Sequence, residues 1–143
     1  MVLELPQKRL INNLQELDSF TRDLAKFIKK KPLPFYILLT GELGAGKTTL
    51  TRFLLHRFGI KGPVTSPTFV ILNQYNAGQL TINHMDAYRL TEKEDLSQYE
   101  ELFHNSLNVI EWPEHLNFEW EKLPHLKIKI KSRNKSTRLI EME

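Results

Sequence analysis

The sequence predicts an α/β fold. Two hairpin patterns indicate antiparallel strands, and a buried strand leads through a glycine-rich loop into a helix. The composition agrees, because 41% hydrophobic and 26% charged residues are typical of globular domains. With 143 residues, we expect one domain spanning residues 1–143.

Charge and cysteine content exclude several classes of function. The sequence holds no cysteine, which rules out disulfides, thiolate catalysis and cysteine-based zinc sites. Its net charge of +3 permits an anionic ligand or a nucleic-acid partner without requiring either. The longest apolar run, residues 35–39, is far shorter than the roughly 20 residues that span a bilayer, and the amino terminus has no signal-peptide pattern. We therefore expect a cytoplasmic protein with no membrane segment.

Strand and helix patterns alternate through the first half of the chain. Residues 2–5 predict a short edge strand that Pro6 closes. Residues 12–31 have helical spacing, with Asn13 and Glu16 as a capping box, and two prolines then end the helix. The next predicted elements are a buried strand at 35–40, a glycine-rich turn at 41–46 and a helix at 48–58.

The second half predicts two hairpins. In the first, residues 68–72 and 80–82 flank a short turn, and in the second, residues 126–130 pair with 138–140. A helix at 92–103 and a buried strand at 107–110 lie between them. The strand 126–130 and its extension carry basic side chains on one side, and a solvated face explains them as well as contact with RNA does; they are Lys127, Lys129, Lys131 and Arg133.

The most informative segment is GELGAGKT at residues 41–48, which matches the phosphate-loop pattern G-x-x-x-x-G-K-[ST] in full. Glycines let the backbone wrap closely enough for its N–H groups to face phosphate oxygens, and the helix that follows adds the positive end of its dipole. We expect Lys47, as an exposed charge, to bind the β- and γ-phosphates and Thr48 to be a ligand of Mg²⁺. The predicted contacts in the loop are Gly41, Glu42, Leu43, Gly44, Ala45, Gly46, Lys47 and Thr48.

Two acidic residues at strand ends are candidates for a second metal contact. Asp86 follows the strand that closes the first hairpin, and Glu111 follows the strand at 107–110. Open α/β sheets place ligand groups at such ends, although a surface ion pair explains either acid alone equally well. His84 faces the same side as Asp86, and a packed or hydrogen-bonded structural role is favoured for it over metal binding. Trp112 is favoured as a packing residue.

The bound nucleotide is expected to be ATP with Mg²⁺. The guanine-specific pattern D-x-x-G is absent, because Asp86 is followed by Ala87-Tyr88-Arg89, and the pair Asn134-Lys135 lacks the aspartate that reads guanine. A small-molecule P-loop kinase is the alternative. Such kinases carry an arginine-bearing lid, whereas the seven arginines here are scattered along the chain.

Four motifs together resemble the bacterial TsaE family in order and spacing: residues 41–49, Ser-Pro-Thr-Phe at 66–69, His-Met-Asp-Ala-Tyr-Arg-Leu at 84–90 and Ile-Glu-Trp-Pro at 110–113. The resemblance covers roughly residues 5–140. It implies a P-loop NTPase-like three-layer sandwich with a mixed parallel and antiparallel sheet. It also implies a small ATPase needed to make threonylcarbamoyladenosine, the modified base next to the anticodon in tRNAs that read codons starting with A.

The resemblance further implies partners and residue roles. The chain would act with the TsaB–TsaD pair, in which TsaD transfers the threonylcarbamoyl group, and its ATP hydrolysis would reset the complex between turnovers. Direct contact with tRNA stays open. Asp86 and Lys47 would be catalytic, with Asp86 orienting metal or water. Thr48 and Glu111 would bind Mg²⁺. The residues alone leave open which of the two acids, Asp86 or Glu111, is the direct Mg²⁺ ligand. The resemblance adds Thr49, Thr68 in a switch-like loop, and Glu111 to the nucleotide contacts, and it places Trp112 beside the site.

Overall fold

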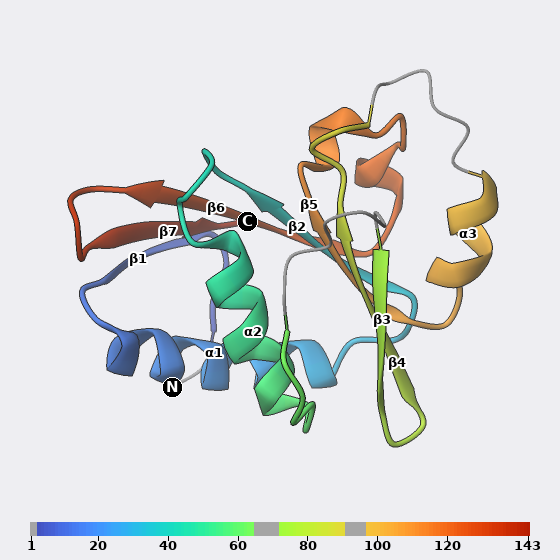
Figure 1. The fold of residues 1–143 in the computed structure, drawn as a ribbon, viewed down its shortest axis with the longest axis horizontal. Coiled ribbons are helices and arrows are strands. Elements are labelled where there is room, and N and C mark those ends of the chain that lie inside the picture. The colour runs from blue at the N-terminus through green and yellow to red at the C-terminus, as the bar shows by residue number, and fades with distance from the viewer. Residues whose placement is uncertain (1–2, 65–71, 91–96) are drawn as a thin grey trace.

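The computed structural model describes residues 3–64, 72–90 and 97–143 (Figure 1). Its described strands form a seven-stranded sheet in the order β1-β7-β6-β2-β5-β4-β3. The elements in chain order, with η for short 3-10 helices, are β1 (Gln7–Ile11), α1 (Leu14–Lys29), β2 (Phe35–Thr40), α2 (Lys47–Arg57), β3 (Leu72–Ala77), β4 (Leu80–Asp86), α3 (Ser97–Phe103), β5 (Leu107–Glu111), η1 (Pro113–His115), η2 (Trp120–Lys122), β6 (His125–Ser132) and β7 (Arg138–Met142).

The middle of the sheet is parallel and its two sides are antiparallel. Strands β6, β2, β5 and β4 run parallel to one another. Strands β7 and β1 extend the sheet on one side and β3 extends it on the other, all in antiparallel pairing. This confirms the predicted mixed sheet. Because β2, β5 and β4 are parallel neighbours, their carboxyl ends at Thr40, Glu111 and Asp86 meet at one edge of the sheet.

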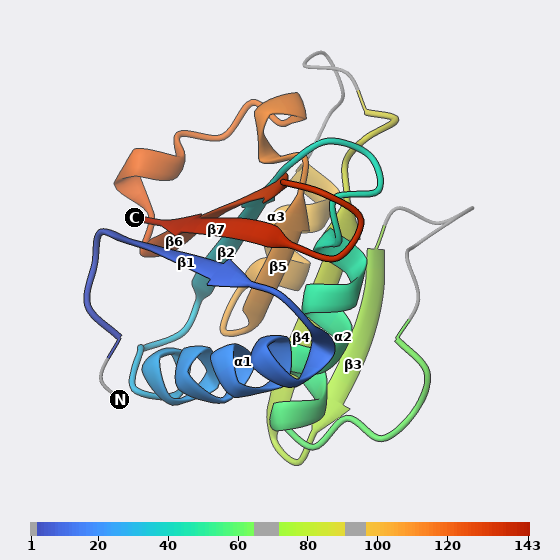
Figure 2. The same ribbon diagram turned by 90° about the vertical axis from the view of Figure 1, so that its left-hand side faces the viewer.

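Helices α1 and α2 pack against one face of this sheet (Figure 2). Alternate residues of the strands point toward them, because side chains of a strand alternate between its faces. Ile37 of β2 and Ile128 of β6 are fully buried there and share a core with Leu24 of α1 and Leu54 of α2. Helix α2 begins at Lys47, directly after the loop that leaves the carboxyl end of β2 at Thr40.

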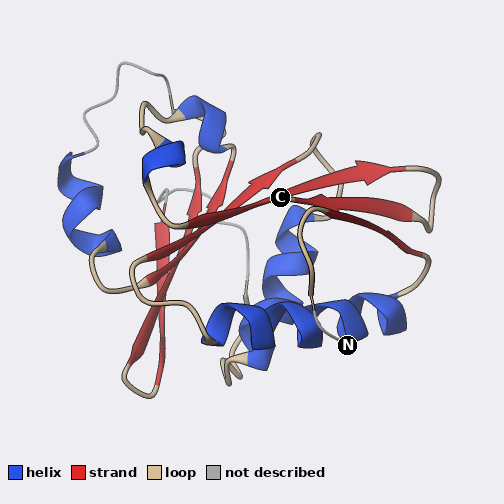
Figure 3. Cartoon of the chain, turned by 180° about the vertical axis from the view of Figure 1, so that it is seen from behind, coloured by secondary structure: helices blue, strands red, loops and turns tan. Residues whose placement is uncertain are grey.

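The opposite face carries a smaller outer layer. Helix α3 and the two 3-10 helices are grouped there, apart from α1 and α2 (Figure 3). Tyr36 and Leu38 of β2 join Met85 and Phe103 in a second core, in which the Tyr36 and Phe103 rings meet edge to face at 5.8 Å. The predicted three-layer arrangement is confirmed, but the second outer layer covers β2, β5 and β4 and leaves β6, β7 and β1 open on that side.

The amino-terminal edge strand differs from the prediction for residues 2–5, which was wrong. The strand begins after Pro6, at Gln7, and all five of its residues pair with β7. Proline has no N–H to donate, so it precedes the strand instead of closing it. The strand was not recognised in the sequence because the charged residue Arg9 lies in its middle. The Arg9 guanidinium lies over the Phe20 ring and pairs with Asp23 at 3.3 Å.

The start of α1 follows the predicted capping box. The Asn13 side-chain oxygen accepts a hydrogen bond from the backbone N–H of Glu16 at 2.8 Å, and the Glu16 carboxylate accepts one from the backbone N–H of Asn12. The predicted elements at 68–71 and 92–96 lie outside the described residues, which contain the rest of that hairpin and helix. Among the described residues, no helix has the length and apolar character needed to cross a membrane.

Candidate functional site

The glycine-rich loop joins β2 to α2 and is pressed against the β6 strand. At Gly41, where φ is +153°, an added Cβ would lie 2.7 Å from the Ile130 carbonyl oxygen, so only glycine fits. Gly46 has a φ of +109° and is the N-cap of α2. The loop therefore turns its backbone onto the start of a helix, where unpaired N–H groups and the helix dipole favour an anion.

Lys47 lies inside the loop and is buried, with 6% of its surface exposed. The sequence-based expectation of an exposed charge was wrong because the loop wraps around the side chain. Its Nζ donates to the carbonyl oxygens of Gly41 at 2.6 Å and Glu42 at 3.0 Å, and it lies 4.6 Å from the centre of the Trp112 ring. Burial lowers the pKa of the Lys47 ammonium below its ordinary value, and nearby carboxylates, led by that of Glu111, oppose this shift.

The two predicted acids lie side by side next to the loop. Asp86 and Glu111 are paired in register at the ends of β4 and β5. The Thr48 hydroxyl is 3.5 Å from Oε2 of Glu111. These three residues and Lys47 share a cleft of about 270 Å³, which is completed by residues of the loop, by Thr49 and by Trp112. The structure thus brings together most of the described residues that the sequence selected. Gly41, Glu42 and Ala45 do not line this cleft and instead face a neighbouring hollow that Lys129 and Trp112 also line. Thr68 lies outside the described part of the chain.

The donor atoms at this edge fit Mg²⁺. Thr48, Asp86 and Glu111 offer hydroxyl and carboxylate oxygens, which hard cations prefer. Within the described residues there is no cluster of three or more His, Cys, Asp or Glu that would hold a metal alone. Mg²⁺ is usually bound by one or two protein ligands together with waters and substrate phosphates.

His84 reaches the same site from within β4. The residue is fully buried, and its Nε2 lies 2.5 Å from Oε2 of Glu111. Its position two residues before Asp86 places it on the same face of the strand, as the sequence indicated. The contact with Glu111 crosses to the neighbouring strand, and nothing in the sequence pattern could identify it.

An aromatic group stands beside the cleft. Trp112 has a φ of +60°, a conformation that a bulky residue rarely adopts. Its ring stacks on His115 at 5.3 Å and meets Tyr88 at 5.0 Å. The packing role predicted for Trp112 therefore comes with a second one, because the same ring covers the ammonium of Lys47.

A larger cavity of about 470 Å³ adjoins the loop on the other side. It shares Gly46 and Thr49 with the phosphate cleft, so the two spaces are neighbours. Arg138 of β7 lines it, and its Nε donates to the Ala45 carbonyl oxygen at 2.9 Å. The sequence pattern did not predict that this arginine lies beside the loop, because 93 positions separate it from Ala45. Apolar side chains form much of the remaining wall: Ile11, Leu14, Leu17, Leu50, Ile130 and Ile140.

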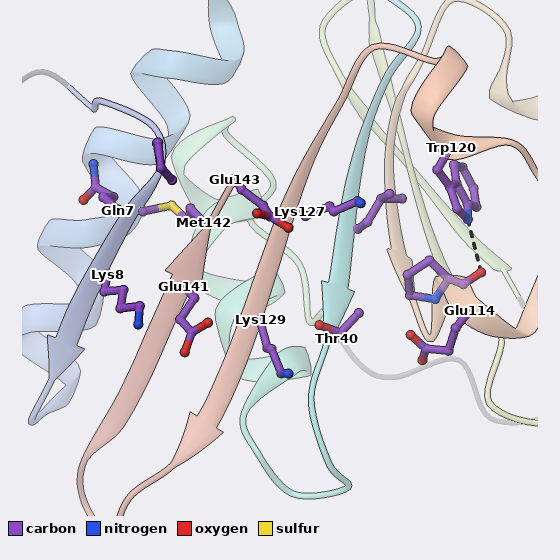
Figure 4. Close-up of a pocket in the computed structure, with 13 residues that line it drawn as sticks. Gln7, Lys8, Thr40, Glu114, Trp120, Lys127, Lys129, Glu141, Met142 and Glu143 are labelled. Carbon is purple, nitrogen blue, oxygen red and sulfur yellow. Dashed lines mark hydrogen bonds between the residues drawn. The ribbon is translucent and has the colours of Figure 1, made fainter.

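A separate groove of about 620 Å³ occupies the open face of β1, β7 and β6 (Figure 4). Its lysines are interleaved with acids, and two of the three lysines of β6 pair with an acid. Lys131 pairs with Glu141 at 2.9 Å, and Lys127 pairs with Glu121. The basic face that the sequence predicted is thus largely balanced in charge. The charged residues lining the groove are Lys8, Lys127, Lys129, Glu114, Glu141 and Glu143.

The fold and the site define a P-loop protein of the nucleotide-binding class: a strand, a glycine-rich loop and a helix, with acids at the neighbouring strand ends. Comparison with known families then identifies it further. The profile described as threonylcarbamoyl adenosine biosynthesis protein TsaE matches residues 11–140, so the chain belongs to the TsaE family. This confirms the predicted family and favours its role in threonylcarbamoyladenosine biosynthesis over the small-molecule kinase.

Individual relatives agree. The chain is similar to proteins named tRNA threonylcarbamoyladenosine biosynthesis protein TsaE from two organisms. The relative from Synechocystis is 38% identical, over 73% of this chain and 68% of the relative. The relative from Bacillus subtilis is 37% identical, over 82% of this chain and 72% of the relative. The match to the Nostoc relative covers 54% of that protein. The crystal structure of YdiB from Bacillus subtilis superposes with a TM-score of 0.71 and 32% identity, covering 99% of this chain and 86% of YdiB.

Proposed function

We propose that this chain is an Mg²⁺-dependent ATP-binding subunit and slow ATPase that acts with TsaB and TsaD in the threonylcarbamoyladenosine modification of tRNA. The observation that carries the proposal is the meeting of Thr48, Asp86 and Glu111 with Lys47 in one cleft at the mouth of the phosphate loop. An anion and a divalent cation are the ligands that suit this arrangement. Family membership supplies the reaction in which the nucleotide is used.

Phosphate binding requires Lys47 to exchange partners. In the structure its ammonium donates to the carbonyl oxygens of Gly41 and Glu42. The β- and γ-phosphate oxygens are stronger acceptors because they carry charge, so they would take over these donors. Backbone N–H groups of the loop and the first turn of α2 would bind the same phosphates. Lys47 would then stabilise the charge that develops during transfer of the γ-phosphoryl group.

Thr48 and Glu111 would hold Mg²⁺, and Asp86 would orient a water molecule. The bound ion would neutralise phosphate charge. The role of Asp86 follows from its place in register with Glu111 at the end of the next strand. A carboxylate that lines the cleft can accept a proton or a hydrogen bond from a water molecule there.

The cavity beside the loop would hold the adenosine end of ATP. It shares Gly46 and Thr49 with the phosphate cleft, which is the continuity that a single nucleotide needs. Its apolar wall suits the faces of a purine ring, and the side chains of Asn12, Ser136 and Arg138 offer polar contacts at the rim.

Leu14→Ala should weaken ATP binding roughly fivefold while leaving the affinity for tripolyphosphate unchanged. Loss of buried contact with the purine ring costs about 1 kcal/mol, and tripolyphosphate has no ring to lose. Leu14 is 62% exposed at the start of α1, so its truncation costs the fold little. Competition against a fluorescent ATP analogue measures both affinities. Leu10→Ala, at a leucine that is 55% exposed and does not line the cavity, is the control. An equal loss for ATP and tripolyphosphate would place adenosine elsewhere.

Glu111→Gln and Asp86→Asn should impair the site in different ways. Loss of the Glu111 charge should remove most of the Mg²⁺-dependent part of ATP affinity, roughly ten- to a hundredfold, because charged contacts contribute about 1.5–3 kcal/mol. Asp86→Asn should lower turnover more than affinity. Titrations of ATP with and without Mg²⁺, together with measured ADP release, separate the two effects. Glu101→Gln changes the same charge at an exposed residue of α3 outside the cleft and should alter neither. Wild-type behaviour of both site variants would refute the assignment.

A further inference from the structure

We propose that His84 is a positioning residue that fixes the carboxylate of Glu111 for the metal. The inference rests on the proposed function, since it concerns how the Mg²⁺ ligand is held. Two observations carry it: the 2.5 Å contact between Nε2 of His84 and Oε2 of Glu111, and the burial of both side chains. Neither depends on where the nucleotide base lies.

Burial makes the contact consequential for Glu111. The residue has only 3% of its surface exposed, and a buried polar group needs hydrogen-bond partners. Within the described residues, His84 and the more distant Thr48 hydroxyl are the partners of its side chain, and both contact Oε2. The other oxygen, Oε1, is thereby left for the ion. A carboxylate fixed through one oxygen presents the second in a single orientation.

The same contact defines the protonation of the imidazole ring. Glu111 as a metal ligand would be a carboxylate, which only accepts hydrogen bonds, so the proposal places the N–H of His84 on Nε2. Nδ1 then has no hydrogen-bond partner among the described residues although it is buried. A buried nitrogen without a partner is rare in folded proteins, and an apolar side chain would fill the same place without that cost. The role of His84 is therefore to provide an N–H donor at Nε2 and not to fill space in the packing of the sheet.

The test compares two substitutions in the full chain. His84→Leu removes the donor with little change in volume, and His84→Gln restores an N–H near the position of Nε2. The affinity for a fluorescent, slowly hydrolysed ATP analogue is measured across a range of Mg²⁺ concentrations and in the presence of a chelator. We expect His84→Leu to raise the Mg²⁺ concentration for half-maximal effect roughly tenfold, because partners of metal ligands affect affinity by about 10–100-fold. The metal-free affinity should be unchanged, and His84→Gln should recover much of the loss.

Controls separate this role from a structural one. Ile82→Val disturbs a buried residue on the same face of β4 and should leave the Mg²⁺ dependence unchanged. The double variant His84→Leu with Glu111→Gln should need no more Mg²⁺ than Glu111→Gln alone, because the histidine acts through that carboxylate. Equal Mg²⁺ dependence of His84→Leu and wild type would overturn the inference. If wild-type binding itself does not depend on Mg²⁺, the proposed metal site fails instead.

A spectroscopic measurement covers the case in which His84→Leu does not fold. Nitrogen-15 NMR of the histidine rings distinguishes a proton on Nε2 from one on Nδ1. The wild-type protein without metal should show His84 with its proton on Nε2, and Glu111→Gln should shift the His84 resonances more than those of His104, which makes no contact with Glu111. A proton on Nδ1 of His84, or no response to Glu111→Gln, would overturn the inference.

Discussion

ATP hydrolysis by the isolated chain is expected to be slow and to rise steeply when TsaB and TsaD are added. Phosphoryl transfer is catalysed by positioning and by stabilising charge, and an arginine supplied to the transition state contributes about 10³–10⁵ in rate. The described residues that line the phosphate cleft include no arginine. Arg138 lies on the far side of the loop, where its donors are bound to the carbonyl oxygens of Ala45, Asn134 and Thr137.

A docked partner would supply what this open cleft lacks. It would exclude water and offer a positive charge to the γ-phosphate. We therefore expect the rate of ATP hydrolysis to rise by up to the factor of about 10³–10⁵ that an arginine contributes. Steady-state ADP release is measured for the chain alone, with TsaB–TsaD, and with TsaB–TsaD and tRNA. A variant that cannot bind phosphate should show no acceleration. Rapid hydrolysis by the chain alone, unchanged by the partners, would contradict a coupled subunit.

Lys47→Met should reduce ATP affinity by roughly ten- to a hundredfold. A charge-assisted contact to phosphate contributes about 1.5–3 kcal/mol, and the substitution removes that charge. Methionine is chosen because Lys47 is 6% exposed and packs beneath Trp112, so a side chain of similar length keeps the loop filled. Isothermal titration with ATP measures the affinity, and circular dichroism checks the fold.

A lysine in the open groove provides the matched control. Lys8→Met removes the same charge from an exposed residue of β1 that lines the groove and not the phosphate cleft. Its ATP affinity should equal that of the wild type. If Lys8→Met weakened binding as much as Lys47→Met, the nucleotide would lie in the groove and not on the glycine-rich loop.

Local patterns in the sequence predicted the centre of the fold and most of the site. The strand at 35–40, the loop and helix after it, and the acids Asp86 and Glu111 each have a signal within a few residues, because strand ends and glycine turns are local features. The parallel pairing of β4 and β5 then places the two acids side by side, so no further sequence signal is needed to predict that they meet.

What the sequence did not predict depends on contacts between distant strands. The edge strand at Gln7–Ile11 is recognisable only through its pairing with β7. The approach of Arg138 to Ala45 and that of His84 to Glu111 are set by strand register across the sheet. The burial of Lys47 depends on how closely the loop wraps around it, which the motif pattern does not specify.

The Arg138 contact couples the site to the order in which the parts of the chain fold. The phosphate loop contacts Ile130 and Arg138, which belong to the β6–β7 hairpin, and 93 positions separate Ala45 from Arg138. Among the described strands, β1 pairs with β7 alone, so β1 remains unpaired until β7 is in place. A partly folded chain in which this hairpin has not yet formed would therefore have the loop sequence without its supports. The site gains its full shape only after contacts between distant parts of the chain have formed, and such contacts are slow to form.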